Sequence, residues 1–491
     1  MYSLGIDIGS SSVKVSLLDI ASGKCVKSAT HPSAEAPIRS PRKGWAEQDP
    51  EMWWHYILDG VLELSGSCRM SEVVSIGITY QMHGLVAVDK NVRPVRDSII
   101  WCDSRAVGIG AEALEGIGYD KCMAHLLNSP GNFTASKLAW VKRNEPERYE
   151  RIWKFMLPGD YIVYKLSGEV ATTATGLSEQ ILWDFKEARR ADFVAEYYGI
   201  DPALIPDIVP SIGVAARTND ATESILGIPA GTPIAYRCGD QPNNAFSLNV
   251  LEPGEVAATG GTSGVVYGVT DVPKADAQSR VNTFLHVNDL PQSHRYGVLL
   301  CINGTGILNS WIHRNVTPGM RYAEMDELAA TAPAGSDGLR VLPFGNGAER
   351  VLGNRNIGAA FAGLDLVRHG VPHLLRAAQE GIAFSFRYGI DVMRDLGLDL
   401  RVIRAGRANL FLSPLFRETL ATLCGADIQL YDTDGSLGAA RGGALGAGFY
   451  ASAAEAFATL EQVGSVGPRA DWKEALDEAY GQWKEQLKKT L

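Results

Sequence analysis

The sequence has few cysteines, and they are not arranged to bind a metal or to pair as disulfides. The chain of 491 residues contains 7 cysteines, and no two of them form a Cys-x-x-Cys pair. An odd, scattered set of thiols in a large chain is typical of reduced cysteines in the cytosol and argues against structural zinc. We therefore expect a cytoplasmic protein without disulfides.

The sequence also lacks clustered positive charge and long apolar runs. Its 46 Lys and Arg residues are outnumbered by 56 Asp and Glu residues, which gives a formal net charge of -10. Because no dense basic run occurs, we expect neither a nucleic-acid partner nor binding to an anionic membrane. The least charged long stretch, residues 442–454, is too short to cross a bilayer. The N-terminus has neither the basic nor the apolar region of a signal peptide, so none is predicted.

Motifs of several enzyme classes are absent as well. Residues 22–25 read Ser-Gly-Lys-Cys, with a cysteine where a Walker phosphate loop needs a hydroxyl. No Gly-x-Gly-x-x-Gly pattern occurs, which argues against a Rossmann dinucleotide site. The histidines lack metal-ligand spacing, and Gly-x-Ser-x-Gly is missing. These absences leave no case for zinc hydrolysis or for a serine nucleophile.

Strand-like and helix-like segments alternate along the chain, which predicts an α/β protein. The chain is too long for one hydrophobic core, so we predict two domains, over residues 1–245 and 246–491. Asp49, Pro50 and Glu51 have the order typical of a helix start. The residues from about Ala470 onward predict a charged amphipathic helix, for which packing against the first domain is left open.

Two similar hairpin patterns lie about half a chain apart, at residues 5–19 and 255–269. Each places a turn of Gly, Ser or Thr residues between two apolar strands. Small residues let backbone N–H groups converge on an anion, and Asp7 beside the first turn suits a phosphate that arrives with Mg²⁺. For either turn alone, an ordinary hairpin is the better interpretation. The pair together with Asp7 favours two turns that hold a polyphosphate from both sides.

Motifs spread over nearly the whole chain resemble those of the FGGY carbohydrate kinases. In chain order they are GIDIGSSSVK, GWAEQDPEMWW, QMHG, WCDSR, CGDQPNNA, TGGTSG, HLLRAAQEGIAFSF and LGAARGGALGAG. The resemblance implies two actin-like, RNase-H-like ATPase domains with a cleft between them, the sugar on the N-terminal side and the nucleotide on the C-terminal side. Residues 81–84 and 101–105 are most similar to the kinases that phosphorylate D-xylulose on its 5-hydroxyl, with ATP and Mg²⁺.

The resemblance also implies roles for individual residues. Asp240 matches the catalytic base, and Asp7 matches the acid that holds the Mg²⁺–ATP phosphates. The matching sugar-binding positions are Gln81, Met82, His83, Asp103 and Asp240, with Gln241 and Trp101 as weaker candidates. The matching nucleotide-binding positions are Gly9, Ser10, Ser11, Ser12, Lys14, Thr259, Gly260, Gly261, Thr262, Ser263, Gly264, Gly304, Gly306, Gly406, Ala408 and Asn409.

Several of these residues have a purely structural alternative. An isolated acid such as Asp240 is often a turn or a cap, Lys14 can be a solvated strand lysine, and Met82 can be core packing. Asp103 can form a local ion pair with Arg105. We favour the base for Asp240, because a positioned carboxylate can take the acceptor proton during phosphoryl transfer. We also favour sugar binding for His83 and Asp103, and less so for Met82.

Three segments depart from the family pattern. In residues 404–416, Arg407 replaces a glycine of the adenine segment, which puts adenine contacts and nucleotide preference in question. Residues 168–184 lack an acid often found near their middle, so we expect this segment to bear on which sugar fits. Residues 344–356 also depart, without a role that we can assign.

Other functions stay open at this point. The same kinase fold can act on ribulose, erythritol, gluconate or another ketose or polyol. An actin- or Hsp70-like ATPase without a sugar acceptor has no need of the QMHG and CGDQ motifs. A catalytically inactive sugar sensor is least favoured, since Asp7 and Asp240 are both present. The sequence leaves a homodimer open.

Overall fold

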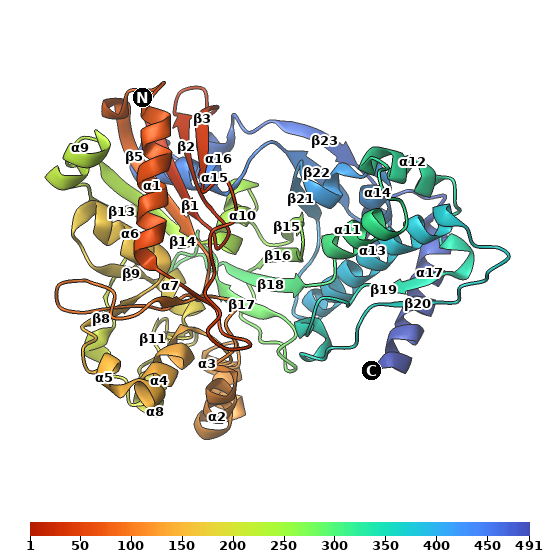
Figure 1. The fold of residues 1–491 in the computed structure, drawn as a ribbon, viewed down its shortest axis with the longest axis horizontal. Helices are drawn as coiled ribbons and strands as arrows, with labels where there is room; N and C mark the ends of the chain where they lie inside the picture. The colour runs from red at the N-terminus through yellow and green to blue at the C-terminus, as the bar shows by residue number, and fades with distance from the viewer. The chain divides into compact units, whose positions relative to one another are not determined.

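The chain folds into two compact units in a computed structural model that describes residues 1–491 (Figure 1). Unit 1 comprises Met1–Asn249, Phe284–Arg295 and Thr433–Leu460; unit 2 comprises Val250–Thr283, Tyr296–Asp432 and Glu461–Leu491. The first crossing between units lies close to the division expected from the sequence. The chain then returns to unit 1 near its C-terminal end, which a single division does not describe.

Unit 1 is built on a six-stranded sheet. Strands β1, β5 and β14 run parallel to one another, whereas β2, β3 and β13 pair with their neighbours in the antiparallel sense. The first predicted hairpin is confirmed, because β1 and β2 pair across it. In order across the sheet the strands are β13 (Ile212–Arg217), β14 (Pro233–Gly239), β5 (Val73–Tyr80), β1 (Tyr2–Ile8), β2 (Val13–Asp19) and β3 (Cys25–His31).

The two faces of strand β1 have different partners because successive side chains of a strand point to opposite faces. Leu4, Ile6 and Ile8 are fully buried and belong to the same hydrophobic core as Trp53 of helix α1 (Pro50–Ser65). The residues between them face a different helix, α15. An acid at the end of β1 can therefore lie in a strand and still point away from the apolar core.

Helix α15 (Gly435–Gly446) packs directly on the backbone of the sheet. A Cβ atom on Gly5 would lie 1.8 Å from the carbonyl oxygen of Ser436, and one on Gly77 would lie 1.8 Å from that of Ala439. Only glycine allows this approach. Figure 1 shows α15, in blue, beside the red strands β1 and β2. The Gly/Ala-rich sequence of α15 is therefore a packing surface.

The remaining elements of unit 1 are shorter. Its other helices are α2 (Val107–Ile117), α3 (Tyr119–His125), α4 (Thr134–Asn144), α5 (Pro146–Tyr149), α6 (Pro158–Ser167), α7 (Ala174–Glu179), α8 (Asp192–Tyr198), α9 (Asp220–Leu226), α10 (Asp240–Ser247) and α16 (Ala453–Phe457). Its other strands are β4 (Glu47–Gln48), β6 (Val86–Val88), β7 (Ser98–Ile99), β8 (Lys154–Met156), β9 (Ala171–Thr173), β10 (Trp183–Asp184), β11 (Arg189–Arg190) and β12 (Asp207–Val209).

The sheet of unit 2 repeats the plan of the first. Three antiparallel strands, β18, β16 and β15, are followed by β21 and β22, which run parallel to β15, and by the antiparallel β23. The second predicted hairpin is also confirmed, as β15 and β16. In order the strands are β17 (Asn282–Leu285), β18 (Tyr296–Ile302), β16 (Gly264–Thr270), β15 (Glu255–Gly260), β21 (Val402–Gly406), β22 (Asp427–Tyr431) and β23 (Gln462–Val466).

The C-terminal helix belongs to unit 2. Helix α17 (Lys473–Thr490) packs on α13, α14 and β19, and Trp483 is buried there with its indole N–H on the carbonyl oxygen of Val341 at 2.9 Å. This differs from packing on the first domain, which the sequence left open. None of the helices is both long and apolar enough to cross a membrane. The other elements are α11 (Gly306–Asn315), α12 (Tyr322–Ala330), α13 (Val371–Asp395), α14 (Pro414–Cys424), β19 (Arg340–Leu342) and β20 (Ala360–Ala362).

Candidate active site

The candidate site of unit 1 lies at the carboxyl ends of its parallel strands. Asp7 is level with Thr79 on β5, and Thr79 is level with Cys238 on β14. The QMHG turn, residues 81–84, follows β5, and Asp240 follows β14 by one residue. Ligands of open α/β sheets bind beyond the carboxyl ends of the strands. The fold therefore gathers three of the predicted motifs at one sheet edge.

The turn of the first hairpin, residues 9–12, is closed by its own backbone. The N–H of Gly9 donates to the carbonyl oxygen of Ser12 at 2.9 Å. The carbonyl oxygen of Ser10 accepts from the Gln48 side chain at 2.7 Å, and the indole N–H of the half-exposed Trp101 reaches the Ser10 hydroxyl at 3.4 Å. Ser11 is exposed. The turn is held from one side and open to solvent on the other.

Asp7 points toward the N-terminus of helix α15. A Cβ atom on Gly435 would lie 2.2 Å from Oδ2 of Asp7, so the first residue of the helix must be glycine for the carboxylate to fit. The pKa of Asp7 is raised from 3.8 to about 7, first by burial and then by the negative charges of Asp240 and Asp434, against the opposing charge of Lys14. Three carboxylates and one ammonium group thus share this corner.

Lys14 lies opposite Asp7 in the hairpin, but its partner is Asp434. The ammonium nitrogen lies 2.5 Å from Oδ2 of Asp434, and both side chains are about one-third exposed. Asp434 also caps helix α15, because its Oδ1 accepts from the backbone N–H of Leu437 and from the Ser436 hydroxyl. Burial raises the pKa of Asp434, but these donors and Lys14 lower it more, so Asp434 stays ionised.

Asp240 is the first residue of helix α10, directly after β14. Its carboxylate accepts hydrogen bonds from the side chain of Gln241, at 3.2 Å, and from the backbone N–H of Met82. Burial raises the pKa of Asp240 from 3.8 to about 6, although these donors lower it in part. A carboxylate with this pKa is ionised at neutral pH and can still take up a proton.

The QMHG turn is anchored to its neighbours through the main chain and through side chains. The N–H of Gln81 donates to the carbonyl oxygen of Ile8 at 2.8 Å, and its side-chain amide donates to Gln48 at 3.1 Å. Met82 is buried, and the side chain of His83 is 18% exposed. The structure thus brings Gln81, Met82 and His83 together with Asp240.

Asp103, predicted to bind the sugar, has a carboxylate that is occupied by protein groups. Arg105 holds it in a bidentate ion pair, with Nη2 2.6 Å from Oδ2 and Nε 2.9 Å from both oxygens. The backbone N–H of Ala46 also donates to Oδ2 at 2.6 Å. Asp103 has no exposed surface. The local ion pair, which was the alternative, is what the structure contains.

In unit 2 the TGGTSG turn lies against the start of helix α11. The N–H of Gly306 donates to the carbonyl oxygen of Gly261 at 3.0 Å, and that of Ile307 donates to Thr262 at 3.1 Å. A Cβ atom on Gly306 would lie 2.2 Å from the Gly261 oxygen. Residues 260–264 and 304–306, predicted as nucleotide-binding, therefore form one packed loop cluster within this unit.

The atypical adenine segment joins the same cluster. Gly406 ends β21, and Ala408 and Asn409 follow it on the surface. A Cβ atom on Gly261 would lie 3.7 Å from the Asn409 side-chain nitrogen. Arg407 is exposed and bonds through its backbone N–H to the carbonyl oxygen of Tyr431 at 3.0 Å. Within unit 2, the three predicted nucleotide segments are neighbours.

Comparison with known proteins decides the family. A family model described as "FGGY family of carbohydrate kinases, N-terminal domain" matches residues 2–247, and a second family model, for the C-terminal domain of the same family, matches residues 256–451. This chain belongs to the FGGY family of carbohydrate kinases. The family and the enzyme class predicted from the sequence, a sugar kinase that uses ATP, are thereby confirmed.

Relatives and solved structures agree with this assignment. The chain is 26% identical to the xylulose kinase of Staphylococcus xylosus over 404 residues, 82% of each chain. It is 27% identical to the xylulose kinase of Escherichia coli over 446 residues, 90% of this chain and 89% of the relative. A "xyloylose kinase" from Brucella ovis superposes with a TM-score of 0.89 at 25% identity, covering 99% and 98% of the chains. A gluconate kinase from Lactobacillus acidophilus shares the fold at a TM-score of 0.88 and 22% identity, covering 99% and 97%. The predicted two-domain actin-like fold is confirmed.

Sequence reasoning missed several residues of this FGGY kinase that contact the site. Asp434 reaches Lys14 from the last part of unit 1, and its signal was the helix-cap pattern Asp-Gly-Ser before an Ala- and Gly-rich run. Glu179 and Lys137 contact His83 from helices α7 and α4. Nothing in the sequence around these two residues distinguishes them from surface charges.

Glu349 was also missed, although its segment stood out as unusual. It has no exposed surface, and its carboxylate accepts from the backbone N–H groups of Asn303 and Gly304, each at 2.9 Å. Burial raises its pKa from 4.5 to about 7, although the two donors lower it in part. In the FGGY kinase, Glu349 therefore holds the loop that packs on the TGGTSG turn.

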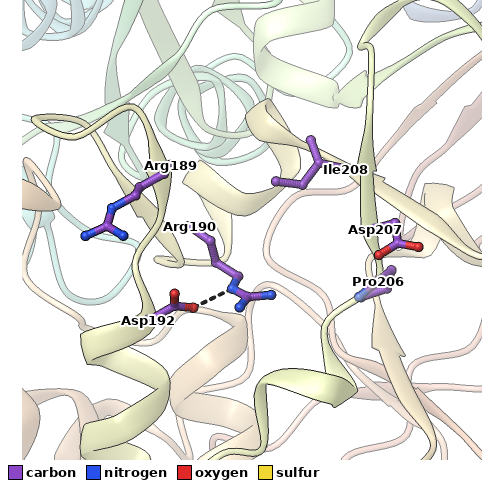
Figure 2. Close-up of a pocket in the computed structure, with 6 residues that line it drawn as sticks. All are labelled: Arg189, Arg190, Asp192, Pro206, Asp207 and Ile208. Atoms are coloured by element: carbon purple, nitrogen blue, oxygen red, sulfur yellow. Dashed lines mark hydrogen bonds and ion pairs between the residues drawn. The ribbon is translucent and has the colours of Figure 1, made fainter.

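A cavity of about 330 Å³ lies elsewhere in unit 1 (Figure 2). It is lined by Arg189, Arg190, Asp192, Pro206, Asp207 and Ile208. Arg190 is tied to Asp192 by an ion pair, and none of the lining residues belongs to a kinase motif. We assign no role to it.

Proposed function

We propose that this FGGY kinase transfers the γ-phosphoryl group of ATP to the 5-hydroxyl of D-xylulose. The relatives named xylulose kinase, matched over four-fifths or more of the chain, support this substrate. The observation that carries the chemistry is the half-buried carboxylate of Asp240, which accepts the N–H of Met82 in the sugar-binding turn.

Asp240 acts as the general base. The sugar oxygen forms a bond to the γ-phosphorus, the bond from that phosphorus to the bridging oxygen of ADP breaks, and the hydroxyl proton moves to Asp240. A pKa of about 6 suits this role, because the group is ionised before transfer and accepts the proton late in the transition state. His83 and Gln241 contact the sugar, and Met82 shapes its slot.

Asp7 and the first turn serve the phosphates. Mg²⁺ prefers oxygen ligands and keeps much of its water shell, so one protein carboxylate with the phosphates is enough to hold it. The residues fit the ion, because the negative charges of Asp240 and Asp434 repel that of Asp7 and a divalent cation would offset this repulsion. When bound, Mg²⁺ neutralises phosphate charge. Lys14 stays with Asp434 and orients the start of α15.

The loop cluster of unit 2 binds the nucleotide. Small residues at 260–264, Gly304, Gly406 and Ala408 let a phosphate or a base approach the backbone. Arg407, in place of a glycine, is the position at which nucleotide preference is most open to change.

The substrate is tested by ADP release in a coupled assay with D-xylulose, D-ribulose, erythritol, gluconate and no sugar. The highest kcat/KM is expected with D-xylulose. A higher kcat/KM with another sugar of the panel would refute D-xylulose as the substrate but would leave the sugar kinase assignment intact. ATP hydrolysis that no sugar changes would instead favour an ATPase without a sugar acceptor.

The base is tested by Asp240→Asn, with Asp89→Asn as a matched control on a loop outside the site. Asp240→Asn is expected to lower turnover about 10²–10⁴-fold without lowering the melting temperature. Asp89→Asn is expected to leave turnover unchanged. Undiminished turnover of Asp240→Asn would end the assignment. A cytoplasmic location and a homodimer stay predictions, to be checked by fractionation and by light scattering.

A further inference from the structure

His83 has a backbone conformation that its neighbours must maintain. Its φ is 61°, in the left-handed region that non-glycine residues rarely adopt, and such a residue persists only where the surroundings fix it. Its N–H donates to Oε2 of Glu179 at 3.0 Å, and its carbonyl oxygen accepts from Nζ of Lys137 at 2.8 Å. Both main-chain groups of this residue are thus held by buried ionisable side chains.

The side chains of Glu179 and Lys137 are buried to an unusual degree for ionisable groups. The side chain of Glu179 is 2% exposed, and Lys137 has no exposed surface. Burial raises the pKa of Glu179 well above 4.5 and lowers the pKa of Lys137 from 10.5 to about 7. Burying such groups is unfavourable unless they are well bonded. Lys137 donates its hydrogen bonds to two site segments, since Nζ also donates to the carbonyl oxygen of Ile100 at 3.1 Å.

The backbone of residue 179 also holds the imidazole ring of His83. Ring atom Nδ1 lies 2.8 Å from the backbone carbonyl oxygen of Glu179. A carbonyl oxygen only accepts, so Nδ1 carries the proton and Nε2 of the neutral ring is an acceptor. The rings of Phe133 and Phe284 lie 4.8 Å and 5.4 Å from the imidazole, between centroids, and keep it in this orientation.

Adjacent N–H groups of the turn therefore reach two different carboxylates. Met82 donates to Asp240, and His83 donates to Glu179. A Cβ atom on Gly239, the residue before Asp240, would lie 3.2 Å from Oε1 of Glu179, so the two acids are close neighbours. A shift of the turn away from Glu179 would also move the donor that holds Asp240.

We propose that Glu179 and Lys137 are positioning residues for the sugar, which hold His83 so that its ring accepts a hydrogen bond from a sugar hydroxyl. The inference rests on the proposed sugar kinase function. It makes the turn a specificity element, because a site built around an acceptor discriminates against a sugar that lacks the matching hydroxyl. Glu179 lies in residues 168–184, the segment expected to bear on sugar choice.

The kinetic test compares Glu179→Ala, Glu179→Gln and Tyr80→Phe. Glutamine keeps an oxygen that can accept from His83, and Tyr80→Phe removes only the second donor to Glu179, which lies 2.8 Å from Oε1. Glu179→Ala is expected to raise KM for the sugar about tenfold or more, with KM for ATP unchanged. Glu179→Gln is expected to recover much of the loss, and Tyr80→Phe to resemble the wild type. An unchanged sugar KM, or an equal rise in both KM values, would overturn the proposal.

Lys137→Met tests the other side of the turn, because methionine fills similar space without a donor. The same rise in sugar KM is expected at an unchanged KM for ATP. If this variant does not fold, as judged by its melting temperature, Glu179→Ala and the spectroscopic test below still decide.

The protonation of the two ring nitrogens of His83 can be measured independently of enzyme activity, by ¹⁵N-histidine NMR of the full chain. His83→Gln identifies the signal of His83. The wild type is expected to show the Nδ1–H form, because Nδ1 donates to the backbone carbonyl of residue 179. Glu179→Ala keeps that carbonyl but removes the acceptor of the His83 N–H, so a shifted His83 ring signal is expected. An Nε2–H ring in the wild type would refute the positioning of His83. Failure of the wild type to phosphorylate any sugar would refute the proposed function and leave this measurement standing.

Discussion

Replacing Asp7 by asparagine is expected to stabilise the protein while it inactivates the enzyme. The carboxylate of Asp7 lies in a corner with Asp240 and Asp434, which raise its pKa together with burial. Asparagine has the same shape without the charge. It removes the repulsion, and it also removes the group proposed to hold Mg²⁺.

The stability gain should depend on pH, with a definite sign. The pKa of Asp7 is about 7 in the folded state, whereas an aspartate in the unfolded chain has its ordinary value of 3.8, so the folded protein binds more protons between these values. Stability contributed by this group is then complete below about pH 4 and is lost as pH rises through 7. Full ionisation corresponds to about 4 kcal/mol. Because Asp7 is partly exposed, solvent screening reduces the expected effect to about 2 kcal/mol.

The assay is the melting temperature of wild type and Asp7→Asn from pH 5 to pH 9. The variant should melt roughly 1–2 °C above the wild type at pH 5 and roughly 2–5 °C above it at pH 9, because the effect grows between pH 4 and pH 7. Asp19→Asn is the matched control at the other end of the same hairpin. Hydrogen bonds from Ser22 lower the pKa of Asp19, so its replacement should destabilise above pH 5. A difference in melting temperature between wild type and Asp7→Asn that stays constant from pH 5 to pH 9 would refute the reasoning.

Further predictions concern packing and loop support. Gly435→Ala places a Cβ atom 2.2 Å from the Asp7 carboxylate, so it should lower stability by about 1–3 kcal/mol and reduce turnover. Gly481→Ala is the control: it has nothing within 4 Å and should raise stability by up to about 1 kcal/mol. Equal melting temperatures of the two variants would contradict this prediction. Glu349→Ala leaves two backbone N–H groups without their acceptor and should raise KM for ATP more than KM for the sugar, measured in the same coupled assay. Asp103→Asn should lower the free energy of unfolding in urea by about 3 kcal/mol, because it weakens the buried ion pair with Arg105. A change in the KM for the sugar without loss of stability would instead support Asp103 as a sugar ligand.

The sequence predicted the local elements of the site well. The alternation around Asp7 predicted strands β1 and β2, and Asp49 caps helix α1 as expected, with its side chain on the N–H of Glu51. These features depend on neighbours within a few residues, so periodicity and turn chemistry are enough to find them. The family motifs then identified the enzyme class.

The contacts that complete the site could not be predicted in the same way. Lys14 and Asp434 are 420 residues apart, and Glu179 lies 96 residues from His83. No local pattern reports that such residues meet, or that an acid in a loop-like stretch is buried. Asp103 is the opposite case, because its partner Arg105 is only two residues away and the ion pair was one of the two interpretations that the sequence offered.

The glycine-lined contact of helix α15 bears on the order in which the protein can mature. During synthesis, strands β1, β5 and β14 emerge from the ribosome long before residues 433–460 exist. Until then, the flat sheet face at Gly5 and Gly77 has no helix to cover it, and the carbonyl oxygen of Ala440 that accepts the Ser3 hydroxyl at 2.6 Å is missing. The unit that contains the N-terminus therefore cannot finish folding until nearly the whole chain has been made, and a fragment ending near residue 250 would lack part of its own core.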